Sequence, residues 1–237
     1  MNIVGKISNR LHKEWKPKTE TGLLSYHNEF QNIDMSKGKW LVLARTRHML
    51  NDLENVLYTN GMYYRNKFKK AYEKDLYEAV MDWELFRKGK QLNGEQVKRI
   101  ASYMKPDQFS RKRIKEFISD NLYTIGELKL KHGLNTDAVW FESFTAAPEK
   151  QVHYIRKMRK NGEELNQEPR ILLSTIHGVK GGEADNVVLL TDLSKNTQSN
   201  YERYPDDENR LFYVGATRTK NHLHIVRPKD IYKSYRI

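Results

Sequence analysis

The segment from Ser174 to Glu183 has the residue types and spacing of a ligand-binding loop. It leaves one apolar run and enters another through a polar, glycine-rich connection that includes Thr175, His177 and Lys180. Ligands of open parallel sheets bind beyond the carboxyl ends of the strands, which is where these side chains and Glu183 would lie. The same pattern also fits a simple glycine turn with a histidine that caps a strand, and this segment alone does not decide between the two interpretations.

A second segment, from Asp206 to Lys220, could carry a phosphate contact. Its first residues are acidic, which favours a helix N-terminus, and Arg218 lies near the expected end of that helix. An arginine held there could bind a phosphate through two parallel hydrogen bonds, a geometry that lysine cannot reproduce. The alternative is an ordinary solvated or ion-paired arginine.

Apolar runs separated by helical patterns predict the elements that position these residues. Trp40 to Ala44 is typical of a buried strand, and the apolar spacing from Met49 to Leu57 predicts a helix that ends at Asn60-Gly61. A further helix is expected through Leu211 to Thr217. Three more apolar runs predict strands, at residues 171–173, 187–190 and 223–226. Strands that alternate with helices predict an α/β fold with a mainly parallel sheet flanked by helices.

Residues 66–167 have a different character from the rest of the chain. They contain charged stretches with helical patterns, from Glu73 to Lys88 and from Gly94 to Met104, and no convincing buried strand. We therefore expect an inserted, mostly helical subdomain there. Residues 1–65 and 168–237 would be the two parts of the α/β domain.

The charge balance indicates a polyanionic partner. The 237 residues include 42 Lys and Arg against 30 Asp and Glu, which gives a formal net charge of +12. The chain also has 14 Tyr, 8 Phe and 4 Trp, whose rings could stack on bases. We therefore favour nucleic acid as the partner over a charge that serves solubility alone.

The sequence excludes several other classes of site. Without cysteine the chain has no disulfide framework, zinc-thiolate site or thiol nucleophile. Residues 1–15 have apolar residues at near-helical spacing but no apolar core of signal-peptide length, and no stretch approaches the roughly 20 apolar residues of a membrane span. We expect a cytoplasmic protein with no membrane partner and no bound metal of its own.

The two polar segments, in this order and spacing, resemble motifs V and VI of the UvrD/Rep-type superfamily 1 DNA helicases. The usual forms of these motifs are TxHxxKGxE and RxxYVxxTR. The matching residues are Thr175, His177, Lys180, Gly181 and Glu183 for the first, and Arg210, Tyr213, Val214, Thr217 and Arg218 for the second. Leu43 to Thr46 resembles motif IV, except that Ala44 replaces a tyrosine that often stacks on adenine in the family.

The resemblance implies the second of two RecA-like motor domains, which shares an ATP site with the first. By analogy, Arg218 would be an arginine finger on the γ-phosphate and Arg45 a second arginine that reaches the same phosphate. Lys180 and Gly181 would lie near the phosphates or the partner domain, and Glu183 would accept a hydrogen bond from the ribose.

The resemblance also implies a polynucleotide partner and a place for the insertion. Thr175 and His177 would face single-stranded DNA, and the full helicase would act at junctions of single- and double-stranded DNA. The variable helical domain of the family is inserted between motifs IV and V, where residues 66–167 lie.

A P-loop is missing from the sequence. This motif, G-x-x-x-x-G-K-[ST], cradles the phosphates and holds magnesium, and no run of the chain matches it. ATP and Mg²⁺ would be bound mainly by the first motor domain, in the same longer chain or on another polypeptide, and this chain alone is expected to be inactive. The rival interpretation is an ATP-independent nucleic-acid-binding or partner-docking module that retains a motor fold.

Overall fold

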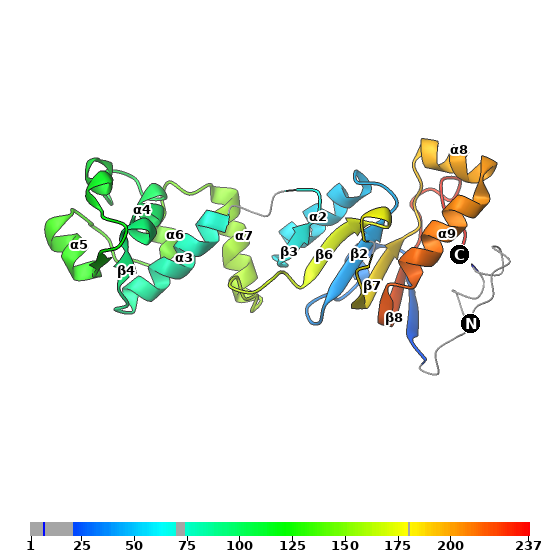
Figure 1. The fold of residues 1–237 in the computed structure, drawn as a ribbon, viewed down its shortest axis with the longest axis horizontal. Coiled ribbons are helices and arrows are strands. Elements are labelled where there is room, and N and C mark those ends of the chain that lie inside the picture. The colour runs from blue at the N-terminus through cyan, green and yellow to red at the C-terminus, as the bar shows by residue number, and fades with distance from the viewer. Residues whose placement is uncertain (1–6, 8–20, 70–73, 180) are drawn as a thin grey trace. The chain divides into compact units, whose positions relative to one another are not determined.

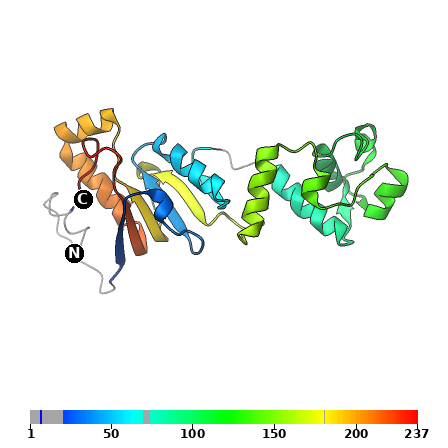
Figure 2. The same ribbon diagram turned by 180° about the vertical axis from the view of Figure 1, so that it is seen from behind.

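The computed structural model of the chain describes residues 7, 21–69, 74–179 and 181–237 (Figures 1 and 2). Two compact units make up the chain: residues 1–70 together with 168–237, and residues 71–167. We call them the sheet unit and the inserted unit. The first division falls at 70/71, five residues after the 65/66 boundary expected from the sequence.

The sheet unit is built on six parallel strands in the order β1-β8-β7-β2-β6-β3. The strands are β1 (Leu23–His27), β2 (Trp40–Ala44), β3 (Tyr64–Asn66), β6 (Ile171–Thr175), β7 (Ala184–Leu190) and β8 (Thr219–Val226). All five residues of β2 are buried, as expected for a central strand of a parallel sheet covered on both faces. The predicted α/β class with a mainly parallel sheet is confirmed.

Helices connect these strands and cover both faces of the sheet. The helices described in the sheet unit are η1 (Phe30–Asn32), α2 (Met49–Thr59), η3 (His177–Val179), α8 (Lys195–Arg203) and α9 (Pro205–Ala216). The path from β2 through α2 to β3 and the path from β7 through α9 to β8 run in opposite directions along the sheet. Because such crossovers are right-handed, α2 and α9 lie on opposite faces (Figures 1 and 2).

The core on the α9 face is formed by alternate residues of the central strands. Leu41 and Leu43 of β2 and Leu189 of β7 are buried in one cluster with Phe212 of α9. Gly215 lets α9 approach closely, because a Cβ at this position would lie 3.1 Å from Leu189 Cδ1. This packing fixes α9 across the sheet.

The inserted unit is mainly helical. Its elements are α3 (Lys74–Arg87), β4 (Leu92–Asn93), α4 (Gly94–Ser102), η2 (Arg111–Glu116), β5 (Leu122–Tyr123), α5 (Ile125–Lys131), α6 (Trp140–Ser143) and α7 (Glu149–Lys160). The sequence predicts α3 and α4 to within a few residues, and the only strands described in this unit form one short antiparallel pair. An Asn93–Gln96 capping box begins α4, where the side chain of each residue bonds the backbone N–H of the other.

Two further findings concern the expectations from sequence. The helix predicted over residues 1–15 lies outside the described residues, apart from Ile7, which is buried. Within the described part of the chain, no helix combines the length and apolar character that a membrane crossing requires.

Candidate functional site

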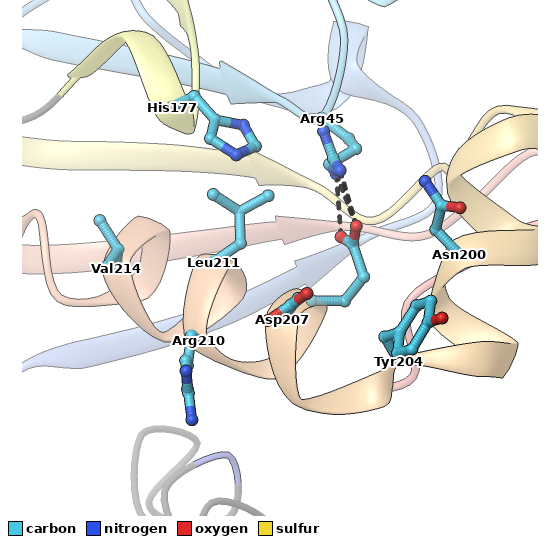
Figure 3. Close-up of a pocket in the computed structure, with 9 residues that line it drawn as sticks. Arg45, His177, Asn200, Tyr204, Asp207, Arg210, Leu211 and Val214 are labelled. Carbon is cyan, nitrogen blue, oxygen red and sulfur yellow. Dashed lines mark hydrogen bonds and ion pairs between the residues drawn. The ribbon is translucent and has the colours of Figure 1, made fainter.

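The carboxyl edge of the sheet brings Arg45 and His177 together. Ala44, the last residue of β2, pairs with Thr175, the last residue of the neighbouring strand β6, so the residues that follow both strands leave the sheet side by side. Arg45 and His177 line a common pocket there (Figure 3). Two of the predicted site residues, far apart in sequence, are therefore neighbours in the fold.

Arg45 is held by a carboxylate of α9. Its Nε donates to both oxygens of Glu208, at 3.0 Å to Oε1 and 2.9 Å to Oε2, and its Nη2 donates to Oε1 at 2.7 Å. The Glu208 side chain is 4% exposed and that of Arg45 is 17% exposed. Desolvation and fork geometry make this a well-defined ion pair. Nη1 of Arg45 is not used by Glu208 and can donate to a further anion.

The surroundings of His177 lower its pKa and so favour the neutral imidazole. Desolvation lowers its pKa, the positive charge of Arg45 lowers it further, and Glu208 opposes the shift. A neutral imidazole offers one N–H donor and one acceptor, which suits a contact with a phosphate oxygen or a base.

Thr175 shapes the loop that follows β6. Its side chain is buried, and its Oγ1 accepts a hydrogen bond of 3.1 Å from the backbone N–H of Gly178. Thr175, which is predicted to contact DNA, is thus buried and holds the turn, whereas His177 is exposed.

Glu183 and Arg218 lie at the opposite edge of the sheet. The loop from Ile176 to Glu183 crosses the α9 face and ends where β7 begins, and the backbone N–H of Ala184 donates to the carbonyl of Arg218 at 3.1 Å. Arg218 folds back along α9, where its Nε donates to the carbonyl of Val214 at 3.0 Å. The predicted ribose contact Glu183 and the predicted γ-phosphate contact Arg218 therefore both lie at the edge where β7 and β8 begin, which we call the amino edge.

Two other predicted nucleotide contacts lie in the same loop. Gly181 is exposed and has a φ of +82°, a left-handed conformation that a residue with a Cβ rarely adopts. Lys180 lies outside the described residues.

The structure does not bring Arg45 and Arg218 onto one phosphate. Their guanidinium groups bond to α9 at Glu208 and at Val214, six residues apart. Since a helix rises about 1.5 Å per residue, these positions are roughly 9 Å apart along the axis, beyond the reach of a single phosphate group. The two guanidinium groups do not meet at one point in the chain without a ligand, and the γ-phosphate role expected for Arg45 stays a prediction.

The pocket beside Arg45 has a cavity volume of about 630 Å³. Its lining residues are Arg45, His177, Asn200, Tyr204, Asp207, Glu208, Arg210, Leu211 and Val214. Figure 3 shows Asn200 and Tyr204 on one side of Arg45 and His177 on the other, while Arg210 extends away from Arg45. Sequence reasoning placed Arg210 in motif VI and missed Asn200, Tyr204 and Glu208, because nothing in the local sequence shows that α8 and α9 close on β2.

A basic and aromatic group next to the same edge was also missed. Lys67 and Phe68 follow β3, the neighbour of β6, and Nζ of Lys67 donates to the carbonyl of Gly178. The Arg47 guanidinium lies over the Phe68 ring, 4.2 Å from its centroid. The short run NKFKK that contains them could have suggested a nucleic-acid contact from sequence.

Ala44 provides no stacking surface. It is fully buried in β2, so a base cannot reach it. Ala44 therefore cannot provide the stacking on adenine that a tyrosine at this position often provides in the family.

Comparison with known proteins identifies the part of the chain that carries most of these residues. The family model of the UvrD-like helicase C-terminal domain matches residues 148–229, which include β6, η3, β7, α8, α9 and β8. No curated protein matches the chain in sequence. The matched segment, the parallel RecA-like sheet and both polar segments agree, and residues 148–229 are similar to a UvrD-like helicase C-terminal domain.

Proposed function

We propose that the chain is the second motor half of an ATP-dependent DNA helicase or translocase. The observation that supports this most is the separation of two sets of polar residues onto two edges of one sheet. One set follows the carboxyl ends of β2 and β6, and the other meets where β7 and β8 begin. The loop 176–183 and helix α9 both run from one edge to the other.

The amino edge would complete an ATP site. Arg218 would stabilise charge on the γ-phosphate in the transition state, as arginine fingers do, and Glu183 would bond the ribose. A first motor domain with a P-loop would bind most of the ATP and the Mg²⁺, and Lys180 and Gly181 would face it. No phosphate-cradling loop exists within the sequence itself.

The carboxyl edge would bind single-stranded DNA, on its own or at a junction with duplex. His177, the free Nη1 of Arg45 and the basic residues after β3 offer donors to the phosphates, while the ring of Phe68 offers a stacking face. On this arrangement we propose a DNA contact for Arg45 in place of the γ-phosphate contact that the resemblance implies. Thr175 would act through the loop that it holds.

Cleft closure on ATP would couple the two edges. When Arg218 engages the γ-phosphate, α9 and the loop 176–183 would be fixed at one end; at the other end the loop carries His177, and α9 carries Glu208, which holds Arg45. Cycles of closure and opening would move the strand past His177.

The test is DNA-stimulated ATP hydrolysis by the chain alone and after mixing with a separately made first motor domain. Activity only in the mixture is the expected result, because Arg218 and the P-loop lie on different domains. Salt-sensitive DNA binding with no hydrolysis in either sample would favour the ATP-independent binding module. Hydrolysis by the chain alone would contradict a shared site.

A further inference from the structure

The pocket at the carboxyl edge lies where ligands of parallel sheets bind. The chain connections diverge on either side of the neighbouring strands β2 and β7, and such switch points form a crevice outside the carboxyl ends of the strands. The cavity of about 630 Å³ falls within the roughly 300–1,000 Å³ of small-molecule and cofactor sites. The function proposed above uses only one wall of it, formed by Arg45 and His177.

The opposite wall presents an aromatic ring and an amide. Tyr204, between α8 and α9, is 66% exposed although it is a large side chain beside a pocket. The Asn200 side chain lies next to it in Figure 3, and among the described residues its amide has no hydrogen-bond partner. A ring face and a free amide are the two groups that proteins use to hold an unstacked base.

The charges of the pocket suit one phosphate and not several. Arg45 and Arg210 are balanced by Asp207 and Glu208, and the neutral form of His177 is favoured. A nucleoside triphosphate would bring several negative charges to two carboxylates. A polynucleotide brings one negative charge per nucleotide, and Nη1 of Arg45 can donate a hydrogen bond to that phosphate.

We propose that this pocket binds one nucleobase of single-stranded DNA, with Tyr204 stacked on the base and the Asn200 amide bonded to its polar edge. The proposal rests on the function proposed above, since the phosphates of the strand must run along the carboxyl edge. It adds a base contact to an edge that otherwise offers mainly phosphate contacts.

The test compares two ligands on the full chain by fluorescence anisotropy. One is a labelled oligothymidine and the other is the same backbone with abasic sites throughout. Wild type should bind the first more tightly. Tyr204→Ala should weaken oligothymidine binding by about 5- to 150-fold, the range for loss of one stacked base, and leave the abasic ligand unaffected. Tyr204→Phe keeps the ring and should bind as wild type.

Controls separate this site from general binding and from a fold defect. Tyr232 is 83% exposed and outside the pocket, so Tyr232→Ala should leave both affinities unchanged. Asn200→Ala should weaken only the base-containing ligand, by a few fold. Circular dichroism of each variant should match that of wild type.

Each other outcome has a defined meaning. If wild type binds both ligands equally and salt weakens both, the DNA edge stands and the base pocket is wrong. If it binds neither, the proposed function itself fails and the pocket proposal with it. If free ATP binds more tightly than the oligonucleotide and depends on Tyr204, the pocket serves a free nucleotide and the strand assignment is overturned.

Discussion

Arg218 is the residue on which the motor assignment depends most. It lies between α9 and β8 at the amino edge, and its Nε donates to the Val214 carbonyl, so the side chain has a fixed partner before any ligand arrives. In the complete helicase, Arg218→Ala should lower ATP turnover by about 10³- to 10⁵-fold, because an arginine finger contributes that much to phosphoryl transfer. Steady-state ATPase assays measure this.

Arg218→Lys is the matched variant, because it keeps the charge but not the two-pronged geometry. It should remain far below wild type. DNA binding should be unchanged in both variants, since Arg218 lies away from the carboxyl edge. Near-normal ATP turnover by the Arg218→Ala variant would show that Arg218 is not the arginine finger.

The Arg45–Glu208 pair makes a prediction about stability. Glu208→Ala leaves the mostly buried Arg45 guanidinium without its carboxylate, and we expect a loss of about 3 kcal/mol in unfolding free energy, the lower end for a broken buried pair. Urea denaturation measures it. The double variant Arg45→Met/Glu208→Leu should recover most of the loss, because it removes both charges. A Glu208→Ala protein as stable as wild type would show that the ion pair contributes little to the unfolding free energy.

Between strands β1 and β8, three histidines form an element that responds to pH. His27 shares a hydrogen bond of 3.0 Å with His224, and the rings of His222 and His224 stack at 3.8 Å. Burial, then His222 and His27, lower the pKa of His224 from 6.5 to about 4. The unfolded chain therefore takes up a proton first as pH falls.

Stability of the sheet unit should consequently be highest above about pH 6.5 and fall as the pH approaches 4, by up to roughly 3 kcal/mol from this group. His224→Gln should flatten the dependence of the urea midpoint on pH between 7 and 5. The same change at exposed His153 of α7 serves as the control and should leave the dependence as in wild type. An unchanged profile in His224→Gln would assign the pH response to other groups.

The turn into α4 depends on a glycine. A Cβ on Gly94 would lie 2.2 Å from the carbonyl oxygen of Ile118, so the backbone would have to move. We expect Gly94→Ala to destabilise the inserted unit by about 1–3 kcal/mol, as overpacking does. Gly126 in α5 has open space around it, so Gly126→Ala should be neutral or slightly stabilising. Thermal melts of the two variants should therefore shift in different directions or by clearly different amounts.

The sequence predicts elements whose pattern is local and misses what depends on distant partners. The apolar run 40–44 and the helical spacing after Met49 are found as β2 and α2 almost residue for residue. Strand β1 is missed because none of its five residues is fully buried at the edge of the sheet, so its sequence has no apolar run. At the site, motif spacing locates Arg218 and His177, but the Glu208 partner of Arg45 lies 163 residues away and leaves no local signal.

On the scale of the whole molecule, the insertion leaves and re-enters the sheet unit at neighbouring strands. Tyr64 of β3 pairs with Ile171 of β6, and Arg65 bonds Glu168 at 3.2 Å. Because β3 and β6 are parallel, the chain leaves at the carboxyl end of β3 and re-enters at the amino end of β6, so a linker has to run back along the strands and needs about a dozen residues. We expect the sheet unit with a short glycine-serine linker in place of residues 71–167 to fold and unfold cooperatively.

Stability of this shortened chain should equal or slightly exceed that of its counterpart in the full chain, because a shorter loop costs less closure entropy. Urea unfolding followed by circular dichroism tests it, with retained DNA binding as a second readout. Loss of cooperative unfolding would mean that the sheet unit needs the inserted unit in order to fold.

The pairing of β1 with β8 also has a consequence for synthesis. Ser25 meets its partner His222 only after 197 further residues have been made. At about 5–20 residues per second, the first strand waits roughly 10–40 s on the ribosome before its hydrogen-bonding edge can be covered. During that time Leu24 and Tyr26 have no sheet to join, and the nascent chain presents an open strand that other chains can pair with. Slower translation should lengthen this exposure and lower the fraction of chains that reach the fold.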